Sequence, residues 1–276
     1  MQTPPDGENP ISSSVVRGNS MGRSISMAVA AVLLWSSGAS DRVLAAEIKL
    51  LSPGAMMSSL KLLVPQFEKS SGHRVTVTYS PALALADRIK NGESADIVIL
   101  GEGSADALMK TGKLVAGSKV VIARVGVGVF VRKGDPRPDV STFDAFNRAL
   151  MSAKIITYSD PSLGGTASNY VSGLLDSLDV TGSIKPKIKL AVQYRSIADF
   201  VANGGADFGL NQIAEIVADP RLELVGPLPD PIQRYTYYTA SLVAIGDNQS
   251  AGKELIDFLA STAASDAMRS KGFEPL

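Results

Sequence analysis

The chain has 276 residues, 45% of them hydrophobic, and its 27 basic and 27 acidic side chains give a formal net charge of zero. This balance gives no support to a surface that binds nucleic acid or another polyanion, so nucleic acid is not expected as a partner. The chain contains no cysteine and one histidine, which excludes disulfides, thiolate metal sites, a lipid-modified N-terminal cysteine and a multi-histidine metal centre.

The N-terminal segment is predicted to be a leader and secretory signal. Residues 1–20 are polar without periodicity, and Arg23 then leads into the apolar run Ile25–Trp35, which is too short to span a bilayer. Small residues follow, so cleavage after Ala39 and cleavage after Ala45 both fit, and the strand-like sequence that begins just beyond favours the second. Secretion without a lipid anchor or a later membrane-spanning run predicts a periplasmic protein.

Strand and helix patterns alternate in the next part of the chain. Strands are predicted over 47–51, 73–80 and 95–101, and an amphipathic pattern typical of a helix follows each of them. The first helix is expected to end at Gly72, and a loop over 80–87 is expected before the second. Three βα units in succession favour an α/β fold with an open, parallel, doubly wound sheet, in which ligands gather at the carboxyl ends of the strands.

Two long β-rich runs, Val120–Asp135 and Ile232–Gly246, bracket a further α/β segment. The first is too long for one flat strand, and Gly126 and Gly128 would let it bend as it leaves one sheet for another. This pattern predicts two lobes, each a doubly wound, mostly parallel sheet, joined by two β-rich hinge connections with a cleft between the lobes. A single helix over 250–272 is predicted to close the chain. The predicted bounds are 1–46 for the leader and signal, 47–126 plus 235–276 for lobe one, and 127–234 for lobe two.

The stretch Ile155–Leu178 contains a strand, a loop and the start of a helix. A β-branched run meets a turn rich in serine, aspartate, proline and glycine, and an amphipathic segment follows. We expect the helix to begin near Gly165 and Thr166, with a hydroxyl available to cap it and several backbone N–H groups unpaired. Such N–H groups and the helix dipole attract anions. An ordinary capped helix would show the same pattern.

Loops after other predicted strands carry the same kinds of group, namely hydroxyls, backbone amides and side-chain amides. These groups hold an anion by hydrogen bonding without a counter-charge. Arg195 could add a bidentate contact to a carboxylate, or it could be a surface arginine at a helix start. The sequence predicts no catalytic residue, no metal ligand and no cofactor. The predicted ligand-binding residues are Ser52, Gly54, Ala55, Met56, Ser80, Ala82, Gly165, Thr166, Tyr194, Arg195, Asn211 and Gln212.

Residues outside this set carry weaker expectations. His73 is predicted to be exposed to solvent in a turn. Asp160 is the most suitable acid or base in the loops, yet an aspartate before proline at a strand end is also ordinary turn chemistry. The tyrosines at 235, 237 and 238 follow a period close to two, so some are expected in the core and others on the hinge surface.

Five segments occur in an order and at spacings that match a known family. They are FEKSSGHRVTVTY, LADRIKNGESADIVILG, YSDPSLGGTASNY, ADFGLNQ and the C-terminal SAGKELIDFLAS, and together they cover nearly all of Glu47–Leu276. The pattern resembles the periplasmic solute-binding proteins of the molybdate-binding type, which are the secreted receptors of ATP-driven importers. The resemblance implies a two-lobed receptor that closes on a small anion, with an inner-membrane importer permease as a partner. We expect a monomer.

The ligand of that family does not carry over directly. In the molybdate binders a serine in the first loop and another in the second hold the oxyanion, and the matching positions here are Met56 and the run 81–83. Met56 could pack in the core or form an apolar wall of the site. The valine whose amide assists matches Tyr194, and the tyrosine hydroxyl matches Gln212. Since those hydroxyls are missing, we expect an organic anion such as a di- or tricarboxylate rather than molybdate.

A different class of function remains open. Aconitate isomerase is similar to this receptor fold, and an enzyme that moves a proton along a bound polycarboxylate would need the same cleft and one base. Asp160, Glu215 or Tyr79 could serve as that base, with amides stabilising the enolate-like intermediate. The alternative prediction is therefore an isomerase of the aconitate isomerase kind.

Overall fold

The computed structural model describes residues 45–191, 194–274 and 276, and for residues 194–196 it describes the backbone only. The described residues form one compact unit. The predicted leader and signal therefore lie outside the described residues, apart from Ala45 and Ala46. Within the described part, none of the helices is long and apolar enough to cross a membrane.

Nine strands in the described part form one sheet in the order β2-β1-β3-β9-β4-β7-β5-β6, and β8 pairs with β4 off this path. The strands alternate with helices along the chain, as the sequence predicts for an α/β fold. The strands are β1 Glu47–Pro53, β2 Arg74–Ser80, β3 Ile97–Gly101, β4 Val120–Arg132, β5 Ile156–Ser159, β6 Ile188–Ala191, β7 Phe208–Gln212, β8 Leu222–Pro227 and β9 Tyr235–Leu242.

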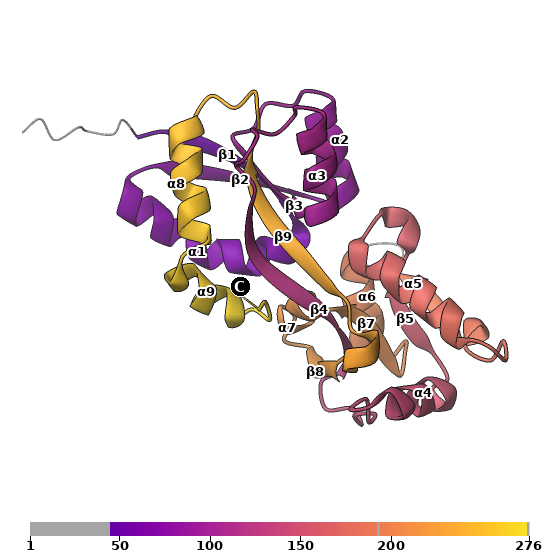
Figure 1. Cartoon of the computed structure of the whole chain (residues 1–276). Helices are drawn as coiled ribbons and strands as arrows, with labels where there is room; N and C mark the ends of the chain where they lie inside the picture. Colours follow the sequence, from indigo (N-terminus) through magenta and orange to yellow (C-terminus); the bar gives the residue numbers. More distant parts are fainter. Residues whose placement is uncertain (1–44, 192–193, 275) are drawn as a thin grey trace, which may run out of the picture. The chain divides into compact units, whose positions relative to one another are not determined.

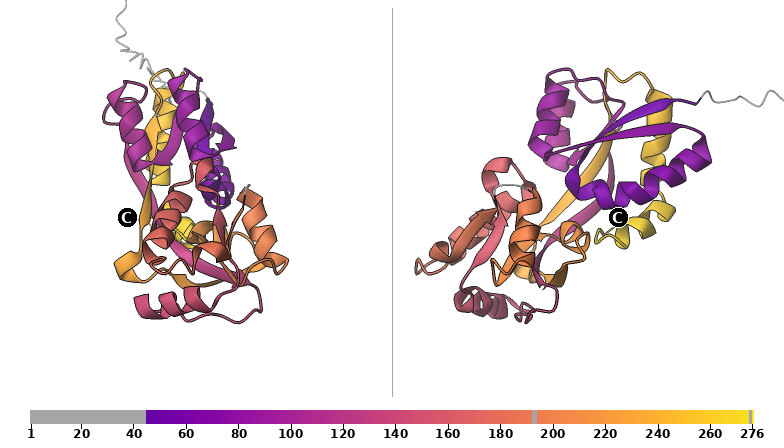
Figure 2. Two further views of the ribbon diagram at one scale, coloured as in Figure 1. Left: turned by 90° about the vertical axis from the view of Figure 1, so that its right-hand side faces the viewer. Right: turned by 180° about the vertical axis from the view of Figure 1, so that it is seen from behind.

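Helices cover both faces of the first half of this sheet (Figures 1 and 2), with α1, α8 and α9 on one face and α2 and α3 on the other. The α-helices are α1 Met57–Ser71, α2 Ala82–Lys90, α3 Glu102–Lys110, α4 Phe143–Ser152, α5 Thr166–Leu178, α6 Tyr194–Ala202, α7 Ile213–Val217, α8 Gln249–Leu259 and α9 Thr262–Arg269. Short 3-10 helices are η1 Gly54–Met56, η2 Pro161–Leu163, η3 Lys185–Lys187 and η4 Asp230–Ile232.

The predicted fold class is confirmed, but the sheet is more mixed than predicted. β1 lies parallel to β2 and β3, and β5 lies parallel to β6 and β7. The pairings that involve β4 and β9 are antiparallel. The difference arises because the two long β-rich runs do not merely connect the lobes. Each of them is also a strand of the sheet.

The strand β4 changes partner along its length, as its glycines led us to expect. It pairs with β9 as far as Gly126 opposite Tyr235, and with β7 from Val127 opposite Gln212. Figure 1 shows β4 and β9 side by side at this crossing. The Gln233 side chain accepts a hydrogen bond from Val127 N–H (2.9 Å) and donates one to the Val127 carbonyl (2.9 Å), so it takes the place of a strand neighbour there.

The buried apolar residues form separate cores in the two halves of the sheet, one half around β1–β3 and the other around β5–β7. One cluster draws on β5–β7 and on the C-terminal half of β4. A second combines β1, β3 and β9 with α1, α8 and α9, and a smaller third lies under α2 and α3. Ala214 of α7 joins the second cluster although it lies in the segment predicted as lobe two. The lobe bounds given above stay a prediction.

Three local expectations are wrong. The loop predicted over 80–87 is mostly helix, because α2 already begins at Ala82. The predicted single C-terminal helix is two helices, since the Ser261 side chain accepts a hydrogen bond from Ala264 N–H and caps α9. His73 is buried rather than exposed. Its Nδ1 accepts a hydrogen bond from Ala46 N–H (3.1 Å) and its Nε2 lies 3.3 Å from a carboxylate oxygen of Glu254.

Candidate ligand-binding cleft

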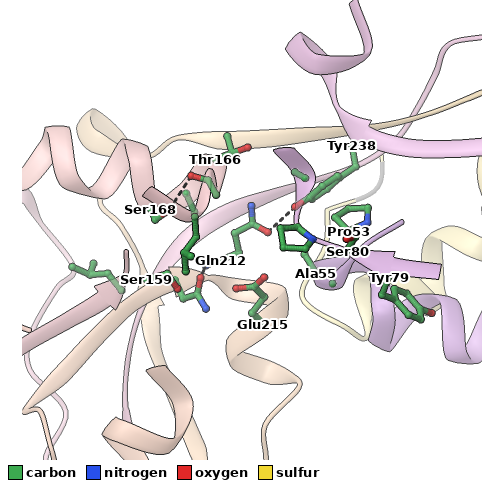
Figure 3. Close-up of a pocket in the computed structure, with 18 residues that line it drawn as sticks. Pro53, Ala55, Tyr79, Ser80, Ser159, Thr166, Ser168, Gln212, Glu215 and Tyr238 are labelled. Atoms are coloured by element: carbon green, nitrogen blue, oxygen red, sulfur yellow. Dashed lines mark hydrogen bonds between the residues drawn. The ribbon is translucent and has the colours of Figure 1, made fainter. Parts of the chain in front are cut away.

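A cavity of about 470 Å³ opens where the carboxyl ends of four strands meet the helices or loops that follow them (Figure 3). The strands are β1, β2, β5 and β7, which belong to both halves of the sheet. The cavity therefore lies at the edge where α/β proteins bind their ligands. It is lined by Pro53, Gly54, Ala55, Tyr79, Ser80, Pro81, Ala82, Ser159, Leu163, Gly165, Thr166, Ala167, Ser168, Leu210, Asn211, Gln212, Glu215 and Tyr238.

The start of α5 contributes backbone N–H groups to this cavity. Gly165 is its N-cap residue, and no side chain caps it. The expectation of a capping hydroxyl is therefore wrong. The nearby Ser168 hydroxyl instead donates a hydrogen bond to the Gly165 carbonyl (2.9 Å), because a serine three residues into a helix reaches back toward the preceding turn. The N–H groups at the helix start stay available to an anion, and the helix dipole favours a negative charge there.

The turn before α5 is shaped by Asp160 and Gly164. The Asp160 carboxylate accepts a hydrogen bond from the Ser162 N–H (2.8 Å). This bond, and after it a bond from the Ser162 side chain, holds the pKa of the Asp160 carboxyl below its usual range. Gly164 adopts a φ of 74°, which favours glycine. Asp160 does not line the cavity, so its position agrees with ordinary turn chemistry.

The loops after β1 and β2 contribute mainly backbone and small side chains. Gly54, Ala55, Pro81 and Ala82 line the cavity, and no side chain caps α2 either. Ser80 supplies a hydroxyl at the end of β2. This side of the cavity offers N–H groups and small apolar surfaces, with few polar side chains.

Gln212 is held in place by β9. Its side-chain carbonyl accepts a hydrogen bond from the Tyr238 hydroxyl (2.9 Å), and its amide donates one to Thr236 Oγ1 (3.2 Å). The pKa of Tyr238 is raised, mainly because its hydroxyl is buried and further because the Glu215 carboxylate is near. The hydrogen bond to Gln212 lowers this pKa by a smaller amount. The Tyr238 hydroxyl is therefore neutral at physiological pH and stays a hydrogen-bond donor.

Two of the three residues considered as a base line the cavity. Glu215 lies in the first turn of α7 and is directed toward the cavity in Figure 3. Burial raises the pKa of Tyr79, so its hydroxyl holds its proton firmly and is a weak base near neutral pH. Glu215 is the better candidate for proton transfer within this cavity.

The cavity brings together eight of the predicted ligand-binding residues and leaves two others beneath its surface. Ser52 is buried with its hydroxyl directed to the Pro53 carbonyl (3.3 Å), and Met56 is packed in the core. The side chains of Tyr194 and Arg195 lie outside the described residues. Ligand binding stays a prediction for all of them. The eight that line the cavity are Gly54, Ala55, Ser80, Ala82, Gly165, Thr166, Asn211 and Gln212.

The sequence prediction missed several lining residues, and two of them carried a usable signal. Ser159 alternates with the buried Tyr158 at the end of β5, so its side chain faces the other way. Ser168 lies three residues after Gly165, the spacing at which helix side chains share a face. Leu163, Ala167 and Leu210 had no polar group to mark them.

The chain belongs to the family of bacterial extracellular solute-binding proteins, whose model matches residues 48–274. This match covers the described sheet apart from Glu47, the first residue of β1, and all of the residues that line the cavity. The resemblance to periplasmic binding proteins of the molybdate-binding type is confirmed by relatives with that name.

Two relatives match nearly the full length of the chain. An aconitate isomerase of Pseudomonas is 29% identical over 259 residues, which cover 91% of this chain and 96% of that protein. The molybdate-binding protein ModA of Azotobacter vinelandii is 24% identical over 240 residues, which cover 83% and 90%. Among solved structures, the sulfate-binding protein SubI of Mycobacterium tuberculosis has a TM-score of 0.68 at 19% identity and shares the fold over 84% of this chain and 87% of that one.

Proposed function

We propose that this protein is a periplasmic receptor of an ATP-driven importer and that it binds a small organic anion with two or three carboxylates in the cleft. The observation that carries the proposal is the meeting of helix starts, hydroxyls and side-chain amides from separate loops in one cavity. Such groups stabilise carboxylate oxygens by hydrogen bonding. Membership of the extracellular solute-binding family supports the receptor role, and an inner-membrane permease would be the partner.

The apolar part of the cavity lining supports an organic anion over a tetrahedral oxyanion. The cavity measures about 470 Å³. Leu163, Ala167 and Leu210 add apolar surface that suits the carbon skeleton of a carboxylic acid. A di- or tricarboxylate would fill this space with both its charged ends and its methylene groups.

A ligand screen by thermal unfolding tests this proposal. The protein from Ala46 onward would be heated with citrate, cis-aconitate and trans-aconitate, and in parallel with molybdate, tungstate and sulfate. At a ligand concentration of 100 times the Kd, binding stabilises the folded state by about 2.7 kcal/mol. We expect the polycarboxylates to raise Tm. Stabilisation by molybdate or tungstate alone would contradict the carboxylate assignment, and no stabilisation by any of the six would contradict anion binding.

A second candidate function is isomerisation of the bound polycarboxylate. The aconitate isomerase relative, similar over nearly the whole of both chains, favours it, and so does Glu215 at the cavity. The base would remove a proton from the methylene carbon of aconitate. The electron pair of the broken C–H bond would form a new C=C bond between the methylene carbon and the central carbon, and the =CH carbon of the original double bond would take up a proton. Backbone N–H groups at the start of α5 would stabilise the negative charge of the intermediate.

Glu215→Gln separates the two functions. If Glu215 acts as a base, the variant loses conversion of cis- to trans-aconitate by about 100-fold or more and still binds substrate. If the protein only binds, wild type shows no conversion, and removing a carboxylate near an anionic ligand tightens binding by a few fold. Conversion would be followed by NMR at high protein concentration. Unchanged conversion in Glu215→Gln would exclude Glu215 as the base.

A further inference from the structure

Two residues that are far apart in sequence approach each other closely at the mouth of the cavity. Leu83 lies in the first turn of α2, and Gly164 lies in the turn before α5. A Cβ atom on Gly164 would lie 2.9 Å from Leu83 Cβ and 3.0 Å from Leu83 Cδ2. Real Cβ atoms essentially never come within 3.0 Å of such neighbours. The two segments can therefore be this close only because residue 164 is a glycine.

This contact lies at the outer rim of the cavity. Ala82, next to Leu83, lines the cavity, and so do Leu163 and Gly165 on either side of Gly164. The side chains of Leu83 and Leu163 are 53% and 42% exposed, so both reach the surface. The rim thus brings an apolar side chain of one half against the backbone of the other.

A second approach lies on the other side of the start of α5. A Cβ atom on Gly101, at the end of β3, would lie 3.9 Å from the Thr166 hydroxyl. Thr166 also borders both the ligand-binding cavity and a neighbouring hollow of about 650 Å³. The first residues of α5 therefore fit between the start of α2 and the end of β3.

We propose that Leu83 and Gly164 form the contact across which the two halves of the protein close over the ligand. This inference rests on the proposed receptor function and adds two residues that determine closure. At this contact the ligand would be covered by the Leu83 side chain and the backbone of Gly164. Closure of the contact therefore favours a ligand whose carbon atoms face the mouth of the cavity.

The position of the Leu83 Cβ explains why the contact depends on glycine. A flexible side-chain end could rotate away from an added methyl group, but Cβ is fixed by the backbone of α2. An alanine at 164 would therefore move the two segments apart. The φ of 74° at Gly164 adds backbone strain for any other residue. Gly182 provides a matched control, because it has a φ of 69° and nothing within 4 Å of its Cβ position.

The first experiment measures the contact without any ligand. Since the chain has no cysteine, the double variant Leu83→Cys/Gly164→Cys can form one disulfide. The two Cβ positions lie 2.9 Å apart, so the segments need to separate by only roughly 1 Å to reach the Cβ distance of about 3.5–4.5 Å that a disulfide requires. We expect rapid and nearly complete intramolecular oxidation. The control pair Leu83→Cys/Gly182→Cys should oxidise at least about tenfold more slowly. Equal rates for the two pairs would overturn the proposed contact.

The second experiment measures closure with trans-aconitate, or with another anion that stabilises the wild type in the thermal screen. We expect Gly164→Ala to weaken its affinity about tenfold more than Gly182→Ala does. Leu83→Gly should restore most of that loss in the Gly164→Ala background, whereas Leu83→Ala keeps Cβ and should restore much less. No difference between Gly164→Ala and Gly182→Ala would contradict a role in closure.

The two experiments separate this inference from the proposed function. If no anion binds to the wild type, the receptor function fails, and the oxidation rates still decide whether the contact exists. If an anion binds and the Leu83→Cys/Gly164→Cys pair oxidises no faster than its control, only the rim contact fails. In the oxidised double variant we expect the anion to bind at least about tenfold more slowly than after reduction. Equal binding rates would show that the contact does not control entry.

Discussion

The two sides of the cavity differ in the kind of group they present. The loops after β1 and β2 present Gly54, Ala55, Pro81 and Ala82, together with Tyr79 and Ser80. The other side presents a hydroxyl at Ser159, the uncapped start of α5, and the amides of Asn211 and Gln212. One side is mainly backbone and small apolar surface, and the other carries most of the polar side chains.

This difference indicates that the two sides of the cavity have separate roles in binding. Hydrogen-bonding groups that are fixed before the ligand arrives give specificity at low cost in entropy. Gln212 has this property, because Tyr238 and Thr236 hold its side chain. On the opposite side, the Ser52 hydroxyl at the end of β1 is buried and directed to the Pro53 carbonyl. The polar side is therefore expected to select the ligand and the backbone-rich side to close on it.

Met56→Ser gives the largest expected effect and tests the backbone-rich side. Met56 has no exposed surface and packs in the core. Truncating a buried methionine and burying a hydroxyl should lower the free energy of unfolding by about 3 kcal/mol. Chemical denaturation measures this loss. Affinity for molybdate should not rise, and a gain of molybdate binding would show that residue 56 reaches the cavity.

Thr166→Pro tests the N–H groups on the polar side. Proline is well tolerated at the first position of a helix, and the preceding Gly165, with φ −72° and ψ 132°, has the extended conformation that a following proline requires. The variant removes both the N–H group and the hydroxyl. We expect ligand affinity to fall by about 2 kcal/mol in calorimetry.

Thr166→Val is the matched control for this prediction, because it removes the hydroxyl and keeps the N–H group. Its loss of affinity should be smaller by about 1 kcal/mol or more. If the two variants lose the same affinity, the hydroxyl rather than the helix start contacts the ligand.

Tyr238→Phe tests whether the polar side is fixed in advance. The variant removes the donor to the buried Gln212 carbonyl, which should lower the free energy of unfolding by about 1 kcal/mol. Affinity should fall by a few fold, since Gln212 loses one of the two bonds that orient it. A loss of stability without any change in affinity would mean that Gln212 does not contact the ligand.

Asp160→Ala gives the smallest expected effect and has a defined pH dependence. Because the folded-state pKa of Asp160 is lowered from 3.8, its hydrogen bonds contribute stability above that pH, and the contribution is lost as the pH falls through the lowered pKa. The variant should therefore have a slightly lower Tm than wild type near neutral pH and the same Tm in strong acid. Asp160→Asn should retain most of the wild-type Tm near neutral pH, because its side-chain oxygen still accepts a bond from Ser162.

The sequence allowed prediction of features that depend on nearby residues. The periodicity of Ile155–Leu178 predicted β5 and α5, and the glycines of Val120–Asp135 predicted the partner change in β4. Both patterns are local, since strand and helix periods are visible within about ten residues. The start of α5 followed from the same patterns, whereas α2 begins earlier than the loop predicted over 80–87 allowed.

Features that depend on distant residues could not be predicted. His73 looked exposed in its turn, but its partners Ala46 and Glu254 lie 27 and 181 residues away in the chain. The pairing of Gln212 with Tyr238 spans 26 residues and two strands. Whether Met56 packs in the core or lines the cavity was open, because a methionine at a strand end suits both positions.

The place of β9 in the sheet has a consequence for how the protein is made. Among the nine strands of the described residues, this one comes last in sequence, yet it lies between β3 and β4. The half of the sheet that holds β1–β3 therefore cannot be completed until residues 235–242 have been synthesised. The intervening segment, which is continuous in sequence, can fold earlier. Because the pairing of β9 with β3 joins residues far apart in sequence, completion of this half is expected to be the slower step of folding.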